Sequence, residues 1–296
     1  MWRFVRSVGF SRKERTMQGK NKVRKLVESA VMIALASALS LFPIMQMPYG
    51  GSVTLASMLP IILIAYRNGI GWGLGSGFAF AFIQQMLGLN NLSYVTTWQS
   101  VVAVIVLDYA LAFVALGLGG IFRGKLGGQN RELLFGTLLV CIIRYFCHVI
   151  SGATVWAGIS IPTTAAMVYS IGYNATYMIP EAIVTAVVAY YVGSMIDFRA
   201  ANITRLAVSE KKAKLPAYCN VLRITAATAV AAAAIFDAVK IFEHLQDGDS
   251  GEFTFVHLGE VAWTPIIVVS AIALAVFVTS FIVTSVVKKK SGTADA

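Results

Sequence analysis

Charged side chains are rare inside the long apolar stretches of this chain, and the few that occur are the first candidates for chemistry. Asp108, Arg144 and Glu181 each interrupt an apolar run. Ionisable residues in such runs are energetically expensive in a membrane, so they are usually paired or functional. Asp108 and Arg144 could form a buried structural pair, or Asp108 could bind a cationic ligand. Residue type alone leaves both interpretations open.

Several other polar and aromatic residues fall at a similar distance from the ends of their apolar stretches. At a rise of 1.5 Å per helical residue, Asp108 lies about 15 Å from the end of its apolar stretch. His148 lies about 12 Å from the end of its own apolar stretch. Trp156, Tyr169 and Asn174 follow in the sequence, near the ends of stretches that face the same side of the membrane. Such a set could bind a cationic aromatic ligand by charge pairing, cation–π contact and amide hydrogen bonds. Alternatively, the aromatic residues form the ordinary belt at a membrane interface.

Asp237, Lys240 and Glu243 form a second charged group, spaced three residues apart. At this spacing they could neutralise one another or lock two helices together. They could also mark a proton or ion path, which would suit an ion-coupled secondary transporter.

The sequence predicts neither catalytic residues nor a bound metal or other cofactor. His148 and Ser151 are three residues apart on one expected helix, without an evident oxyanion site. The three cysteines form no CxxC pair and the three histidines have no metal-ligand spacing. No GxxxxGK[ST] or GxGxxG motif occurs, so any ATP-driven process needs another subunit to hydrolyse ATP.

The elements that must position these residues are membrane helices. Of the 296 residues, 57% are hydrophobic and 13% are charged, with a mean hydropathy of +0.74. This composition lacks the polar residues that cover a globular surface in water, and the apolar runs do not alternate as barrel strands do. We therefore expect an all-α, polytopic membrane protein. Its apolar stretches cover residues 26–43, 52–66, 70–87, 98–121, 133–156, 166–193, 217–243 and 261–287.

The basic residues orient these eight expected spans. Of the 24 Lys and Arg residues, all but Arg144, Arg223 and Lys240 fall before the first span, after the last, or in alternate connections. Because such residues accumulate on the cytoplasmic side, both termini should be cytoplasmic. The net charge of +10 then needs no nucleic acid, since a basic N-terminus beside anionic lipids explains it.

Composition along the chain predicts a six-helix core and a two-helix appendage. Residues 1–25 form a basic cytoplasmic segment and residues 26–196 the core. A polar cytoplasmic linker, 197–216, leads to a membrane extension, 217–290, and a tail, 291–296.

Several motifs of the core resemble the thiamine-specific S component of energy-coupling factor (ECF) transporters, a family of bacterial membrane proteins. The segments are RYFCHVISGATVW (144–156), YSIGYNATYMIPE (169–181), LDYALAF (107–113) and GGSVTLASMLPI (50–61). The resemblance covers roughly residues 23–192. It implies a multi-pass subunit of the bacterial cytoplasmic membrane that binds thiamine with high affinity from outside.

The resemblance also implies a set of thiamine-binding residues. These are Asp108, Tyr109, His148, Trp156, Tyr169 and Asn174, together with an aromatic residue before the fourth span. Spacing does not decide between Tyr94 and Trp98, and Tyr94 is preferred.

Partner subunits follow from the same resemblance. S components dock on a transmembrane coupling subunit through small residues of the first span, which correspond to Ala30 and Ala34. Two cytoplasmic ATPase subunits complete the complex. Alternative functions are an S component for another vitamin or a thiamine precursor, and an ion-coupled secondary transporter.

The chain departs from the family pattern in three places. Asp108 stands where several relatives have Glu. The first outer loop has Gly50 and Gly51 where some relatives have Trp, and Tyr49 is the nearest aromatic residue. The two helices after residue 216 have no counterpart in a six-helix fold.

Overall fold

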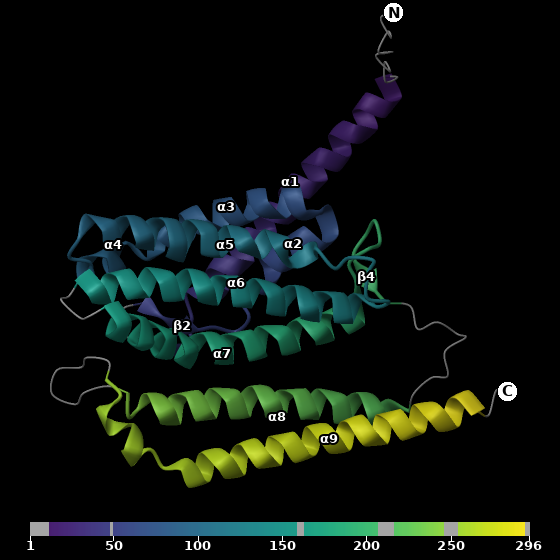
Figure 1. Ribbon diagram of the computed structural model, residues 1–296. Coiled ribbons are helices and arrows are strands. Elements are labelled where there is room, and N and C mark those ends of the chain that lie inside the picture. The colour runs from purple at the N-terminus through teal and green to yellow at the C-terminus, as the bar shows by residue number, and fades with distance from the viewer. Residues whose placement is uncertain (1–11, 48–49, 159–162, 207–215, 246–253, 294–296) are drawn as a thin grey trace, which may run out of the picture.

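The computed structural model describes residues 12–47, 50–158, 163–206, 216–245 and 254–293, and helices dominate these ranges. The long helices are α1 (Arg12–Ser40), α3 (Ile70–Leu87), α6 (Gln129–Gly158), α7 (Thr163–Met195), α8 (Ala217–Phe242) and α9 (Trp263–Thr293). Figure 1 shows them in three layers: α1 and α3 with the short helices, then α6 and α7, then α8 and α9. The all-α, polytopic architecture expected from the composition is confirmed.

Five helical segments are long and apolar enough to cross a membrane, by length and composition. They are Trp98–Gly120, Gln129–Val155, Thr164–Met195, Ala217–Phe242 and Trp263–Val287. Each coincides with one of the expected spans. Helices α1 and α3 cover the first and third expected spans, although they do not meet the same criterion.

The second expected span, residues 52–66, is wrong at its start. Residues Ser52–Val53 form β2, which pairs antiparallel with β1 (Met45–Gln46), and the chain continues as a loop before α2 (Leu59–Asn68). Pro60 lies in the first turn of α2, where its missing N–H costs no helical hydrogen bond. The second segment is therefore a loop that leads into a ten-residue helix.

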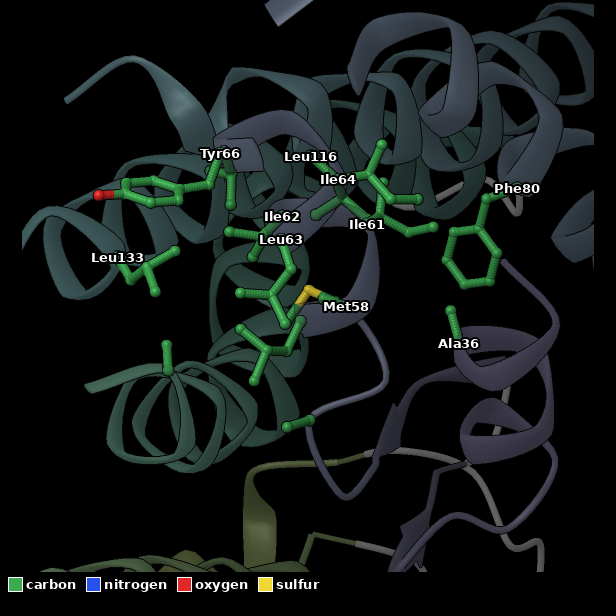
Figure 2. Packing of buried hydrophobic residues seen from close by; sticks show 14 of the residues in the cluster. Ala36, Met58, Ile61, Ile62, Leu63, Ile64, Tyr66, Phe80, Leu116 and Leu133 are labelled. Carbon is green, nitrogen blue, oxygen red and sulfur yellow. The ribbon is translucent and has the colours of Figure 1, made fainter. Parts of the chain in front are cut away.

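The short helix α2 forms the centre of the core. Every residue from Leu59 to Tyr66 is buried. Figure 2 shows Ile61 and Ile62 of α2 among Ala36, Phe80, Leu116 and Leu133, which come from four different segments. An apolar helix that is buried on all sides needs neither a lipid-facing nor a water-facing surface.

The fourth span is a composite of short helical segments. It follows the 3₁₀ helix η2 (Leu89–Tyr94) and comprises α4 (Trp98–Ala103), the π-helix η3 (Val104–Leu111), α5 (Ala112–Val114) and the 3₁₀ helix η4 (Ala115–Gly120). A side chain at Gly117 would overlap the backbone of Gly73 and Leu74, so glycine permits close packing of η4 on α3. The π-helix contains Asp108 and Tyr109, and such segments occur frequently at functional sites.

Hydrogen bonds and ion pairs hold together the helix ends that lie next to the basic connections. Glu132 is fully buried, and its carboxylate accepts hydrogen bonds from Tyr66 Oη (2.5 Å) and Arg199 Nη2 (2.5 Å). The bond to Glu132 raises the pKa of the Arg199 guanidinium above its usual value. Arg67 pairs with Glu28 of α1 at 2.8 Å. Nearby, β3 (Ile196–Asp197) pairs with β4 (Thr204–Arg205) after α7.

Helices α8 and α9 form an antiparallel pair that packs on the core through α7 (Figure 1). Within this pair, Ser270 Oγ of α9 donates to Asp237 Oδ2 of α8 at 2.5 Å. Lys240 pairs with Glu243 at 2.8 Å. Asp237 thus takes part in a hydrogen bond between the two helices, while Lys240 and Glu243 form a local ion pair.

Candidate functional site

A cavity of about 450 Å³ lies between the first outer loop, the fourth span, α6 and α7. This is within the usual size range of small-molecule sites. Its lining includes five of the expected binding residues: Tyr94, Asp108, Tyr109, His148 and Asn174. The fold therefore brings five of the seven expected binding residues to one cavity.

Asp108 is the centre of a polar network in this cavity. Its Oδ1 lies 2.8 Å from Nδ1 of His148, and its Oδ2 accepts a hydrogen bond from Ser151 Oγ at 2.9 Å. On the other side of the imidazole, Nη2 of Arg144 lies 3.4 Å from Nε2. Because an arginine can only donate, this arrangement assigns the proton of a neutral His148 to Nδ1, which donates to Asp108.

Arg144 and Glu181 form the deeper end of the cavity. Arg144 is only 8% exposed; its guanidinium contacts Met58 Sδ and lies 4.6 Å from the centre of the Phe113 ring. The Glu181 carboxylate accepts hydrogen bonds from Thr54 N (2.5 Å) and Thr54 Oγ1 (2.7 Å). Among the described residues, no carboxylate lies within 4.0 Å of Arg144.

The lining carries an excess of negative charge when its carboxylates are ionised. The lining contains two carboxyl groups, those of Asp108 and Glu181, and one guanidinium group, that of Arg144. Among the described residues, Asp108 has no Lys or Arg partner within 4.0 Å, and such a carboxylate favours a cationic ligand.

Tyrosine side chains form the walls. Tyr109 Oη donates to Gly88 O (3.2 Å) and accepts from Asn91 Nδ2 (3.0 Å). On α7, Tyr177 Oη donates to Asn174 Oδ1 at 2.6 Å, and Tyr173 Oη accepts from Gly51 N at 3.2 Å. The last bond joins the first outer loop to α7 across the cavity.

Two charged residues and two tyrosines of the lining were not among the expected binding residues. They are Arg144, Tyr173, Tyr177 and Glu181. The last three are spaced four residues apart on α7 and therefore share one helical face. This four-residue spacing, together with the neighbouring Asn174, is the sequence pattern that indicates a polar face of α7 toward the cavity.

The other aromatic candidates have different positions. Trp98 is 71% exposed and does not line the cavity. Tyr169 does not line it either, and its ring packs on Phe255 beyond α8. Trp156 lies near the end of α6, but its side chain is outside the described part of the structure, as is Tyr49.

The expected docking residues lie on a surface of the molecule. Ala30 and Ala34 are both exposed on α1, beside the exposed apolar residues Val27 and Val31. In Figure 1, α1 belongs to the layer farthest from α8 and α9. The extension therefore leaves these alanines uncovered.

Comparison with known proteins gives a consistent family. Residues 26–197 match the family described as thiamine transporter protein. The chain is 36% identical over 182 residues to the thiamine transporter ThiT of Bacillus subtilis (strain 168), an alignment that covers 58% of this chain and 90% of that protein. A solved structure of ThiT from Listeria monocytogenes has a TM-score of 0.47 and 20% identity, and it covers 58% of this chain and 94% of that one.

The matched region ends where the connection to α8 begins. The family is one of transporters rather than enzymes. The chain is thus a multi-pass protein of the bacterial cell membrane and belongs to the thiamine transporter family.

Proposed function

We propose that this protein is the thiamine-binding S component of an ECF-type importer, which captures thiamine outside the cell with high affinity. The observation that carries the proposal is the cavity lined by the Asp108 carboxylate together with tyrosine and amide side chains. Thiamine joins a cationic thiazolium ring to an aminopyrimidine and a hydroxyethyl group. A carboxylate, tyrosine rings and amide groups complement these three parts.

The residues divide the work of binding. Asp108 supplies negative charge, and His148 and Ser151 hold its carboxylate in place by hydrogen bonds. Tyr109, Tyr173 and Tyr177 provide aromatic walls, while Asn174 offers polar atoms. Trp156 and Tyr94 complete the proposed set with further aromatic surface.

The proposed partners are a transmembrane coupling subunit and two cytoplasmic ATPase subunits. The exposed Ala30 and Ala34 on α1 support close helix packing, because small residues let two helix backbones approach each other in a membrane. The position of α8 and α9 beyond α7 keeps that flank free. The proposed cycle loads thiamine from outside and uses ATP hydrolysis in the partner subunits.

A thiamine titration of the purified protein, followed by tryptophan emission, tests the ligand. We expect saturable quenching below micromolar thiamine. As a comparison, 4-amino-5-hydroxymethyl-2-methylpyrimidine lacks the thiazolium cation and should bind at least about tenfold more weakly, since it cannot form the charge pair. No emission change at micromolar thiamine would contradict the proposal, and preference for the pyrimidine would identify a precursor transporter.

Vesicle transport separates this proposal from an ion-coupled transporter. Thiamine uptake should require the coupling subunit, the ATPases and ATP. Uptake by the isolated chain under an ion gradient, with loss in Asp237→Asn, would instead support secondary transport.

A further inference from the structure

The C-terminal extension reaches the wall of the cavity. One apolar cluster contains Met45, Met47 and Val53 of the first outer loop, Tyr173, Tyr177 and Met178 of α7, and Ala238 and Leu245 at the end of α8. Phe255 and Leu258 of the α8–α9 connection pack against this cluster. The extension and the binding wall are therefore one packed unit.

Phe255 occupies a slot on α7. A Cβ atom at Gly172 would overlap the Phe255 ring, so only glycine at this position admits the ring. The adjacent backbone is fixed as well, because Thr254 N donates to Leu245 O at 2.9 Å. The 3₁₀ helix η5 (Val256–Glu260) then leads toward α9.

The Phe255 ring also packs against the ring of Tyr169. The Tyr169 and Phe255 ring centres are 5.3 Å apart, with an angle of 40° between the planes. Tyr169 lies one helical turn from Tyr173, which lines the cavity and accepts the hydrogen bond from Gly51. Phe255 thus contacts α7 one helical turn from the lining residue Tyr173.

We infer that Phe255 is a positioning residue for the thiamine site: it fixes the Tyr169 ring and the adjacent wall of α7, so that the C-terminal extension takes part in ligand binding. This inference rests on the proposed thiamine-binding function. It gives the extension a role in retention of the ligand, because a wall that is held in place loses less conformational freedom on binding.

The experiment measures thiamine affinity and dissociation rate in the full-length Phe255→Ala protein. We expect the dissociation constant to rise about threefold to tenfold, mostly through faster dissociation, as for loss of one well-packed aromatic pair. Gly172→Ala should have the same effect, since its methyl group displaces the ring from the core side. Val256→Ala is the matched control, because Val256 is adjacent but 80% exposed.

A double-mutant cycle distinguishes positioning from general stability. In a Tyr169→Ala background, Phe255→Ala should cause no further loss of affinity, whereas in a Tyr169→Phe background, which keeps the ring, it should retain its effect. Phe255→Leu keeps apolar volume without the aromatic ring and provides a folded comparison if the alanine variant is unstable.

Wild-type affinity in Phe255→Ala or in Phe255→Leu would overturn the inference. The same would follow if the loss were equal with and without the Tyr169 ring, since that would be an unspecific loss of packing. Failure of the wild-type protein to bind thiamine would instead contradict the proposed function. The two failures are therefore distinguishable.

Discussion

Asp108 gives both of its carboxylate oxygens to protein partners and still retains capacity for a ligand. Each oxygen accepts one hydrogen bond, from His148 Nδ1 or Ser151 Oγ. A carboxylate has about two acceptor positions per oxygen, so further positions remain for a cation or an amine. The two protein bonds hold the orientation of the group, which reduces the cost of ordering it when a ligand binds.

Asp108→Asn should weaken thiamine binding by at least about tenfold, because the amide removes the charge and turns one acceptor into a donor. Asp108→Glu keeps the charge and should lose less affinity. Titration by tryptophan emission measures both variants. Equal affinity of Asp108→Asn and the wild type would remove Asp108 from the binding site.

The sequence predicted the charged centre of the site better than its walls. Asp108 and His148 are unusual in apolar spans, and the motifs around them are specific to the family resemblance. Tyr173 and Tyr177 lie in the family-like segment 169–181, but tyrosines near a membrane interface are common, so only their four-residue spacing with Glu181 pointed to the cavity. Tyr169 was assigned from relatives with six helices, and such a comparison contains no information about Phe255.

At the level of elements, the approach to α2 shows the limit of hydropathy. Residues 52–66 are as apolar as a helical span, yet the first seven of them form β2 and a loop. Pro60 indicated the start of the helix, but no local pattern indicated that Glu181, more than a hundred residues later, accepts the backbone N–H of Thr54. A buried loop is tolerated in a membrane protein where such partners satisfy it.

Glu181→Gln should destabilise this loop. Two donors of Thr54 converge on the carboxylate, and an amide offers only one oxygen, so we expect a loss of ~1–3 kcal/mol in the free energy of unfolding. Thermal unfolding followed by a thiol-reactive dye is suitable, because Cys141 and Cys219 are buried free thiols. Thr54→Ala retains its N–H and should lose less. An unchanged unfolding temperature in Glu181→Gln would show that the hydrogen bonds between Thr54 and Glu181 do not stabilise the fold.

On the scale of the whole molecule, the two flanks of the core have different neighbours. One flank, at α7, is covered by α8, and the other carries the exposed Ala30 and Ala34 of α1. Figure 1 places the layers in this order, with the end of α9 at the same end of the bundle as β4. The extension therefore adds to the ligand-binding unit and leaves the proposed docking flank open.

Ala34→Leu should reduce co-purification with the coupling subunit, because a larger side chain separates the helix backbones. The matched control is Ala275→Leu, an equally small and exposed position on α9. Pull-down of the four-protein complex from detergent measures the effect, and a thiamine titration of the same samples verifies the fold. Equal recovery of both variants would place the docking surface elsewhere.

The shortness of α2 has a consequence for ligand size. The residues that precede α2 line the cavity instead of continuing the helix, so the length of one helix sets how much volume the bundle leaves open. Continuing α2 by two turns would add about 11 Å of helix and occupy the space of the loop. Relatives or redesigned variants with a longer or shorter second helix should therefore accept smaller or larger molecules, without any change in the residues that contact the ligand.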